Sequence, residues 1–370
     1  MNRSPFKRRL SSLRDKLGPN SPDTIWIIQP ENRRYLSGFR APDLQINESS
    51  GSLLISTKKA LLITDSRYTI EAKREACDFD VVTLKWDLIK EFPALLELLK
   101  TKVLGFEEDY LTYKLHRDLS KMLKKLRSPV SLRPINRIVE EMRVIKDQSE
   151  IRAMEASAAM MSGLLNEVIS GLRPGRTEIE IARELEQRAY EAGAEGMAFP
   201  PIVASGPNSA LPHAVPTCRK IGRKEPIIFD VGLKLNGYCC DMTRTIFLDS
   251  PVSKFREIYR TVRNAQLKAI EYIKPGTDST KPDSVARGII KDAGFGIYFG
   301  HSLGHGVGLA THEAPRLSPI NPVKLAKGMV VTVEPGIYIP GKGGVRLEEM
   351  VVIGAKGARI LTKNNCYYDF

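Results

Sequence analysis

The sequence predicts two domains in tandem, an α/β domain followed by an α+β domain. At 370 residues, the chain is too long for one ordinary hydrophobic core and long enough for two. In its first part, short apolar segments alternate with helical patterns, as they do in α/β domains. After about residue 200 the chain changes to strands, turns and glycines, which indicates a second domain built on a glycine-rich sheet.

The elements of the first domain follow from its apolar periodicity. Short apolar runs predict strands over residues 24–28, 52–56 and 60–64. Amphipathic spacing predicts helices over residues 68–76, 88–100 and 113–126. Together these segments fill about 130 residues, which is a normal domain size.

A charged segment at residues 133–148, containing Pro134, marks the predicted boundary between domain 1–135 and domain 148–370. A long helix is expected over residues 149–169, and the sequence LRPG ends it. Thr177 and Glu180 have the spacing of a capping box for the next helix. The strands that follow, around IIFDVG and GYCCDMTRTIFL, are expected to be continuous over residues 227–233 and 238–248.

The composition excludes several classes of protein. With 42% hydrophobic and 27% charged residues, the chain is typical of a globular protein. No apolar run approaches the roughly 18 residues that a membrane span needs, and no apolar stretch follows the basic N-terminus, so a cytoplasmic protein is expected. The five cysteines are odd in number and form no C-x-x-C pair, which argues against a disulfide framework or a thiolate zinc site.

The net charge of +13 raises the question of nucleic acid. The basic residues gather near the N-terminus and over residues 114–137, where their spacing is typical of a solvated helix face. The sequence has no nucleic-acid recognition motif and no basic stretch interleaved with stacking aromatics. No specific nucleic-acid partner is therefore expected.

Histidines and aspartates of the second domain are the first candidates for chemistry. His301, His305 and His312 lie within twelve residues, beside glycines that permit close backbone approach. Asp230 and Asp241 flank an Asn-Gly turn, the strongest short hairpin signal. If Leu235 pairs with Tyr238, Asp230 faces Thr243, and the two aspartates share a face at roughly 5–8 Å. Carboxylates so close repel each other unless a proton or a cation lies between them.

Two glutamates of the second domain also stand in apolar surroundings. Glu334 follows the apolar run VVTV and precedes Pro335, where a carboxylate is expensive unless it is paired or coordinated. Glu348 shares a strand face with Arg346 if residues 345–353 alternate. Glu349 then points the other way, and a surface position is expected for it. Gly232, opposite Asp241, is expected to leave the space beside the aspartates open.

These segments together resemble a known family. IIFDVGLKLNGYCCDMTRT, HSLGHGVGLATHEAP, VVTVEPGIY and GGVRLEEMVVI are similar to the signature segments of the pita-bread metallopeptidases, which include methionine aminopeptidase, prolidase and Xaa-Pro aminopeptidase. ASGPNSALPH resembles the segment that carries the first active-site histidine of that family. The resemblance covers residues 150–370. The first part of the chain is similar in size and pattern to the extra, creatinase-like N-terminal domain of the prolidase, aminopeptidase P and creatinase branch.

The resemblance implies a site with two divalent metal ions. Four carboxylates and one imidazole form a hard, oxygen-rich ligand set that suits manganese, with cobalt or zinc as alternatives. The implied catalytic groups are His213, His312 and Glu334, of which Glu334 also carries the proton to the leaving nitrogen. His301 and Arg346 are implied to line the subsite for the residue after the cut. The implied metal ligands are Asp230, Asp241, His305, Glu334 and Glu348.

The substrate expected from this branch is a peptide with proline in second position, and a homodimer is the expected assembly. The leading interpretation is an Xaa-Pro aminopeptidase, which releases the N-terminal residue. The alternative is an Xaa-Pro dipeptidase, or prolidase, which accepts only dipeptides. A third possibility is a metal-free binding protein or a creatinase-like hydrolase on the same fold. The presence of all five implied metal ligands argues against it.

Overall fold

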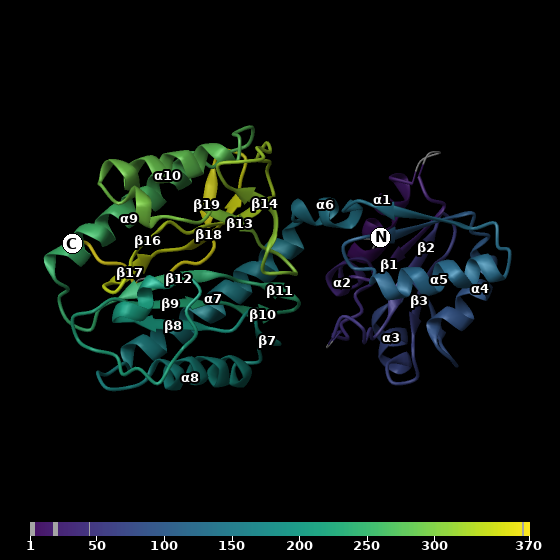
Figure 1. Ribbon diagram of the computed structural model, residues 1–370, viewed down its shortest axis with the longest axis horizontal. Coiled ribbons are helices and arrows are strands. Elements are labelled where there is room, and N and C mark those ends of the chain that lie inside the picture. Colours follow the sequence, from purple (N-terminus) through teal and green to yellow (C-terminus); the bar gives the residue numbers. More distant parts are fainter. Residues whose placement is uncertain (1–3, 18–20, 44, 365) are drawn as a thin grey trace. The chain divides into compact units, whose positions relative to one another are not determined.

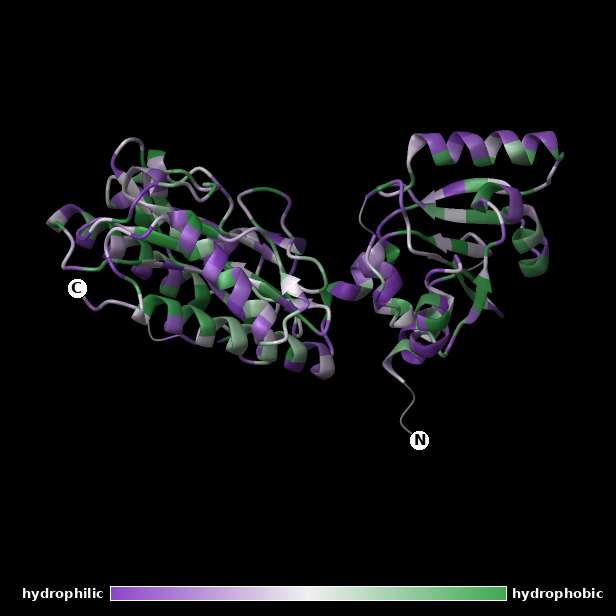
Figure 2. Cartoon of the chain, turned by 90° about the horizontal axis from the view of Figure 1, so that it is seen from below, coloured by the Kyte–Doolittle hydropathy of each residue, from purple (hydrophilic) through white to green (hydrophobic). Residues whose placement is uncertain are grey.

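The computed structural model describes residues 4–17, 21–43, 45–364 and 366–370. They divide into two compact units, one that ends at Met142 and one that begins at Arg143. In both units the helices alternate between hydrophilic and hydrophobic stretches, as amphipathic helices do when one face is buried (Figure 2). Among these residues, no helix is sufficiently long and apolar to cross a membrane.

The N-terminal unit is a six-stranded sheet with helices around it (Figure 1). Its strand order is β4-β3-β2-β1-β5-β6, with β2 antiparallel to both of its neighbours and the other pairs parallel. The strands are β1 (Thr24–Ile27), β2 (Ser52–Ser56), β3 (Ala60–Thr64), β4 (Asp80–Thr83), β5 (Val103–Glu107) and β6 (Ser131–Ile135). The helices are α1 (Pro5–Asp15), α2 (Pro30–Ser37), α3 (Thr69–Glu75), α4 (Leu88–Leu99), α5 (Tyr113–Lys125) and α6 (Ile138–Val144).

The three strands and three helices predicted for this unit are confirmed to within one or two residues. The segment 133–148, by contrast, is no plain linker, because it contains the end of β6 and the whole of α6. β6 lies at the edge of the sheet and its side chains are exposed or half-buried, so it has no apolar run for the sequence to reveal. Pro134 is tolerated there because an edge strand needs fewer backbone donors.

The described residues of the C-terminal unit form four long helices and four small sheets. Its sheets have the orders β11-β10-β7, β12-β9-β8, β14-β13-β15-β18-β19 and β16-β17. The helices are α7 (Gln148–Ser170), α8 (Glu178–Glu191), α9 (Ser253–Glu271) and α10 (Thr280–Asp292), with 3-10 turns η1 (Gly206–Ala210) and η2 (Gly296–Tyr298). The strands are β7 (Gly196–Met197), β8 (Ile202–Ser205), β9 (Ile227–Val231), β10 (Leu233–Leu235), β11 (Tyr238–Cys239), β12 (Met242–Ile246), β13 (Gly304–Gly306), β14 (Glu313–Leu317), β15 (Val330–Val333), β16 (Gly336–Ile339), β17 (Gly343–Arg346), β18 (Glu349–Ile353) and β19 (Ala358–Ile360).

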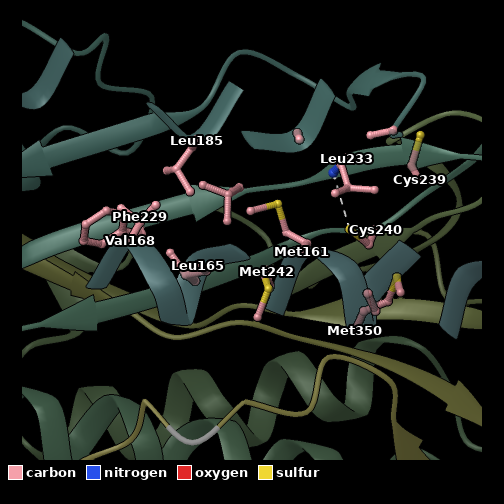
Figure 3. Packing of buried hydrophobic residues seen from close by; sticks show 14 of the residues in the cluster. Met161, Leu165, Val168, Leu185, Phe229, Leu233, Cys239, Cys240, Met242 and Met350 are labelled. Atoms are coloured by element: carbon pink, nitrogen blue, oxygen red, sulfur yellow. Dashed lines mark hydrogen bonds between the residues drawn. The ribbon is translucent and has the colours of Figure 1, made fainter. Parts of the chain in front are cut away.

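Two hydrophobic cores hold these sheets between two pairs of helices (Figure 1). Helices α7 and α8 pack Met161, Leu165 and Leu185 against Phe229 of β9 (Figure 3). On the other side, α9 packs against β15, β16 and β17, and α10 packs against α9 and β14. The predicted capping box of Thr177 and Glu180 is confirmed at the start of α8. The strands that carry the candidate ligands are therefore fixed from both sides.

The predicted hairpin register is confirmed, but its strands are not continuous. Leu235 pairs with Tyr238, and Asp230 pairs with Thr243. Between these pairs the ladder breaks, and the broken ends belong to two different sheets. A Cβ atom added to Gly232 would lie 2.1 Å from the carbonyl oxygen of Cys240. The expectation that Gly232 leaves open space beside the aspartates is thus wrong, because the opposite backbone fills that space.

This close approach makes Gly232→Ala strongly destabilising. The contact is with backbone and with the Phe199 ring, which cannot move aside like a flexible side chain, so we expect the free energy of unfolding to fall by about 3 kcal/mol. Gly163→Ala is the matched control. Gly163 lies in α7 with nothing near its added Cβ, so the same change should raise stability by about 0.5–1 kcal/mol. Denaturant titration of both variants checks the opposite signs.

Glu349 is also not where the sequence placed it. It was expected at the surface, yet it is 2% exposed and forms an ion pair with the fully buried Arg244 at 3.2 Å. The hydroxyls of Thr362 and Tyr367 donate to its two carboxylate oxygens. The C-terminal residues cover this side of β18, which strand alternation alone could not reveal.

Candidate metal centre

One cavity of about 460 Å³ in the C-terminal unit collects the candidate functional residues. Its walls come from segments spread between Phe199 and Glu348, and the fold brings them together. Every site residue that the sequence singled out lines this cavity, namely His213, Asp230, Asp241, His301, His305, His312, Glu334, Arg346 and Glu348.

The candidate ligands lie on strands or at breaks between strands. Asp230 belongs to β9 and His305 to β13, where a register shift follows the histidine. Asp241 lies between β11 and β12, Glu334 between β15 and β16, and Glu348 between β17 and β18. A break in the ladder frees a residue from the strict alternation of a strand. Carboxylates from different sheets can therefore face a common centre.

The side chains converge closely. One ligand atom each from Asp241, His305 and Glu348 lies within 4.8 Å of the other two. The Nε2 atom of His305 is 3.7 Å from an oxygen of Asp241 and 3.4 Å from an oxygen of Glu334. The His305 Nδ1 atom lies 3.0 Å from the carbonyl of Gly306 and must donate to it. The neutral ring then presents its Nε2 lone pair to the carboxylates, as a metal-binding histidine does.

The electrostatics of the cavity favour neutralisation of these carboxylates. Burial raises the pKa of Asp241 well above its usual range, and the charges of Glu348 and Asp230 raise it further. Burial and the neighbouring carboxylates likewise raise the pKa of Glu348. Burial raises the pKa of Glu334 to about 8, with Arg346 opposing. Such a group of acids is unfavourable unless protons or cations balance it.

A pair of divalent cations fits the residues present. Arg346 compensates Asp230 at 2.6 Å, but the other oxygen of Asp230, Oδ1, is buried without a hydrogen-bond partner among the described residues. Unpartnered buried oxygens are rare and call for an explanation such as an ion. Carboxylate oxygens with one imidazole suit hard or borderline divalent cations. Both the surplus of acids and the free oxygen are thereby explained.

Arg346 and His301 belong to a hydrogen-bonded chain. Arg346 donates to Asp230, to the Tyr338 hydroxyl at 2.9 Å, to the Thr243 hydroxyl at 3.1 Å and to the Pro212 carbonyl at 3.2 Å. These bonds occupy four of its five N–H donors. His301 donates from Nδ1 to the Ser302 carbonyl, and its Nε2 atom lies 3.0 Å from the Tyr338 hydroxyl. Both side chains therefore have little capacity left for a ligand.

His312, His213 and Arg316 are exposed polar residues of the cavity wall. The rings of His305 and His312 have centroids 4.3 Å apart. Burial lowers the pKa of His312, and the charges of Arg316 and His213 lower it further, so this ring is neutral near pH 7. Arg316 pairs with His305 across the β13–β14 ladder, which directs its side chain to the same face. Among the described residues, none forms a hydrogen bond or ion pair with its guanidinium.

Sequence reasoning missed four polar residues of the site. Tyr338 links Arg346 to His301, and Arg316 lines the cavity. The Thr243 hydroxyl donates to Glu348 at 2.7 Å, and the Thr332 hydroxyl donates to Glu334 at 3.1 Å. The strand register offered one signal, because Thr243 was expected opposite Asp230. Thr332 lies only two residues before Glu334, and Tyr338 lies in the same β16–β17 sheet as Arg346. Arg316 reaches the cavity through its pairing with His305 in the β13–β14 ladder.

Beside the cavity, Glu313 forms a buried ion cluster with Arg143 and Lys146. Its side chain is 7% exposed, and those of Arg143 and Lys146 are 4% and 1% exposed. Burial alone would raise the pKa of Glu313, but the two cations lower it to about 2. The ordinary value is 4.5, and each tenfold change in acidity corresponds to about 1.4 kcal/mol, so the ionised form is favoured by about 3 kcal/mol in the folded protein.

This pKa predicts a pH-dependent effect of Glu313→Gln. A lowered folded-state pKa contributes stability above pH 4.5 that is lost as the pH falls toward 2. We expect the variant to be about 3 kcal/mol less stable at pH 7, and the difference from the unmodified protein to shrink below pH 4.5. Urea titrations at pH 7, 5, 4 and 3 measure this difference. A constant difference over that range would contradict the assigned cluster.

Comparison with known proteins places the whole chain. Residues 152–355 match metallopeptidase family M24, and residues 9–145 match the creatinase/prolidase N-terminal domain. The Xaa-Pro dipeptidase of Pyrococcus furiosus is 38% identical over 97% of this chain and 98% of its own length. The structure of an Xaa-Pro dipeptidase from Bacillus anthracis has a TM-score of 0.91 at 36% identity, covering 98% of this chain and 99% of that one.

A third relative carries a different activity in its name. The structure of an X-Pro aminopeptidase from Thermotoga maritima has a TM-score of 0.86 at 37% identity, covering 96% of this chain and 98% of that one. The predicted architecture, a creatinase-like domain followed by a pita-bread catalytic domain, is confirmed by these matches. The chain therefore belongs to metallopeptidase family M24 and is a metal-dependent peptidase with a creatinase/prolidase N-terminal domain.

Proposed function

We propose that this protein is an Xaa-Pro dipeptidase, which hydrolyses the bond between the two residues of a dipeptide whose second residue is proline. The observation that carries the proposal is the convergence of five candidate metal ligands, two further histidines and an uncommitted guanidinium in one cavity. Full-length similarity to Xaa-Pro dipeptidases supports it. The sequence alone favoured an aminopeptidase, and these relatives instead favour the alternative.

In this proposal, Asp230, Asp241, His305, Glu334 and Glu348 hold two divalent cations. Those cations supply Lewis-acid polarisation of the scissile carbonyl and acidify the attacking water. Glu334 is the carboxylate that we assign to accept a proton from that water and to pass it to the leaving nitrogen. The Arg346–Tyr338–His301 chain keeps Asp230 and the cavity wall in place.

His213 and His312 provide ring N–H hydrogen-bond donors at the cavity wall. A donor that faces the carbonyl oxygen before reaction is already placed when negative charge develops on that oxygen. Both imidazoles are exposed and line the cavity, and neither ring forms a side-chain hydrogen bond with another described residue. We therefore assign them to the substrate carbonyl and the tetrahedral oxyanion.

We propose specificity for proline because this site does not need an N–H group on the scissile bond. An Xaa-Pro bond is a tertiary amide without an N–H, so a peptidase that grips the N–H cannot use it. Apolar cavity residues, among them Phe199, Pro200 and Ile202, offer contacts to the proline ring. The free guanidinium of Arg316 offers a counter-charge for the carboxylate of a dipeptide. A longer aminopeptidase substrate would carry its carboxylate at least one residue beyond the proline.

Manganese is the metal we propose. The ligand set is rich in carboxylates, whereas zinc sites usually contain more histidine or cysteine. Metal-stripped protein reconstituted with Mn²⁺, Co²⁺ or Zn²⁺ can be compared at equal occupancy, measured by elemental analysis. The highest kcat with Mn²⁺ is expected, and a clear preference for Zn²⁺ would contradict the assignment.

Hydrolysis of Ala-Pro and Ala-Pro-Ala by metal-stripped protein, with and without Mn²⁺, tests the function. We expect Mn²⁺-dependent cleavage of Ala-Pro, with at least about 100-fold lower kcat/KM for the tripeptide. Equal cleavage of both would identify the aminopeptidase that the Thermotoga maritima structure exemplifies. Ala-Ala serves as the control for proline dependence. Cleavage of neither proline peptide would contradict both interpretations.

A further inference from the structure

Two buried glutamates outside the ligand set lie beneath the two loops that carry His213 and His312. Glu178, in the first turn of α8, is 0% exposed, and the side chain of Glu313 is 7% exposed. Neither residue lines the cavity. Carboxylates this well buried are expensive to keep unless their contacts do something specific.

Glu178 joins the two ends of the His213 loop. One of its oxygens accepts from the backbone N–H and the hydroxyl of Ser205, both at 2.7 Å. The other accepts from the backbone N–H of Thr217 at 3.0 Å and from its hydroxyl at 2.6 Å. The side chain of Asn208 donates to both oxygens. A single carboxylate therefore closes the segment 205–217, with His213 inside it.

Glu313 holds the His312 loop in a similar way. It directly follows His312, and its Oε1 atom accepts from the backbone N–H of Ala310 at 3.0 Å. Lys146 donates to the other oxygen at 3.1 Å, and Arg143 also contacts this carboxylate. A Cβ atom added to Gly308 would lie 2.5 Å from Glu313, so this glycine provides the room in which the carboxylate fits under the loop.

We propose that Glu178 and Glu313 are positioning residues, each of which fixes one histidine at the cavity wall. The catalytic importance of the two histidines rests on the proposed function, but their placement does not. Both carboxylates bind backbone N–H groups of the loop that they hold, so their effect is on the path of the chain. Displacing a reacting or stabilising group by about 1 Å is enough to reduce turnover by about 100-fold.

Two glutamine substitutions test the proposal, one at each glutamate. Glu178→Gln keeps the size of the side chain but turns an N–H₂ group toward backbone donors, and Glu313→Gln does the same while leaving two cations uncompensated. We expect each variant to lower kcat for Ala-Pro by about 10- to 100-fold. Among the described residues, no hydrogen bond or ion pair joins either glutamate to the five candidate ligands, so calorimetry should find the Mn²⁺ stoichiometry unchanged in both variants.

Double-mutant cycles distinguish positioning from general stabilisation. In a His213→Ala background, Glu178→Gln should change kcat by less than about 3-fold, whereas in a His312→Ala background it should keep its full effect. Glu313→Gln should change kcat by less than about 3-fold in the His312→Ala background and keep its full effect in the His213→Ala background. Equal factors in both backgrounds would overturn the proposal, because they would show that the glutamates act on the enzyme as a whole.

The imidazole NMR spectrum of Zn²⁺-loaded protein provides a readout that does not need turnover. The chain has five histidines, so single His→Ala variants assign the ring signals. Glu178→Gln should shift or broaden the His213 signals and leave those of His312 in place, and Glu313→Gln should do the opposite. Unmoved signals would overturn the proposal, whereas selective shifts in a protein that cleaves neither proline peptide would uphold it and reject the proposed function.

Milder substitutions cover the case in which a glutamine variant does not fold. Thr217→Val removes one donor to Glu178 at an exposed position, and Lys146→Met removes one cation from Glu313 while Arg143 remains. The same selective pattern is expected at reduced size, about 3- to 10-fold in kcat. If either milder substitution acts equally in the His213→Ala and His312→Ala backgrounds, the proposal is overturned, as it would be for the glutamine variants.

Discussion

Replacing Asp241 with asparagine is expected to lower kcat for Ala-Pro by at least about 1000-fold. Asp241 is 4% exposed and lies 3.7 Å from the Nε2 atom of His305, and it is one of three residues whose ligand atoms lie within 4.8 Å of one another. Asparagine has the same shape but provides only one good ligand oxygen and no charge. Mn²⁺ binding, measured by calorimetry on metal-stripped protein, should fall to at most one ion per chain.

The same substitution should have the opposite effect on the stability of the metal-free protein. Burial and the charges of Glu348 and Asp230 make an ionised Asp241 unfavourable when no cation is bound. Removing one charge relieves that repulsion, so the free energy of unfolding without metal should rise by about 1–2 kcal/mol.

Asp292→Asn, at an exposed position outside the cavity, is the control and should leave both activity and Mn²⁺ binding unchanged. A variant of Asp241 that loses stability while retaining both metals would show that this residue is a structural acid. Loss of metal together with a gain in stability is the signature of a ligand whose burial is balanced by the cation.

The candidate ligands were predictable because acidic residues are rare in buried apolar segments. Glu334 and Asp230 each follow a run of apolar residues that the structure buries, where an acid without a partner would be costly. The Asn-Gly turn fixed the register between Asp230 and Thr243, since a two-residue turn leaves little choice of pairing. Resemblance to a family then assembled the five ligands in order.

Other features depend on contacts that no local pattern encodes. The strand break at Asp241 arises because β10 joins β7 whereas β9 joins β8, and periodicity along the chain carries no information about those partners. Glu349 alternates correctly for a surface residue, yet the C-terminal segment covers it. Tyr338 and Arg316 are an ordinary aromatic and an ordinary cation until the sheets place them in the cavity.

Arg316→Leu is expected to separate recognition of the substrate carboxylate from catalysis. In the proposed dipeptidase, the guanidinium forms a charge-assisted hydrogen bond with the proline carboxylate, because Arg346 is already committed to Asp230, Tyr338 and Thr243. Losing that bond should lower kcat/KM for Ala-Pro by about 10- to 100-fold, mainly through KM. Steady-state kinetics over a wide range of substrate concentration gives both constants.

Ala-Pro amide is the substrate that isolates this effect, since it lacks the carboxylate but keeps the scissile bond. The unmodified protein should cleave the amide poorly, and Arg316→Leu should change that rate by less than about 2-fold. Arg183→Leu, which removes an exposed arginine of α8 outside the cavity, controls for the loss of one positive charge in this basic protein. An equal loss on Ala-Pro and its amide would mean that Arg316 acts on the nearby His305 and His312 rings and not on the substrate carboxylate. In that case the dipeptide preference would have to come from a wall that closes the cavity, because no other uncommitted cation lines it among the described residues.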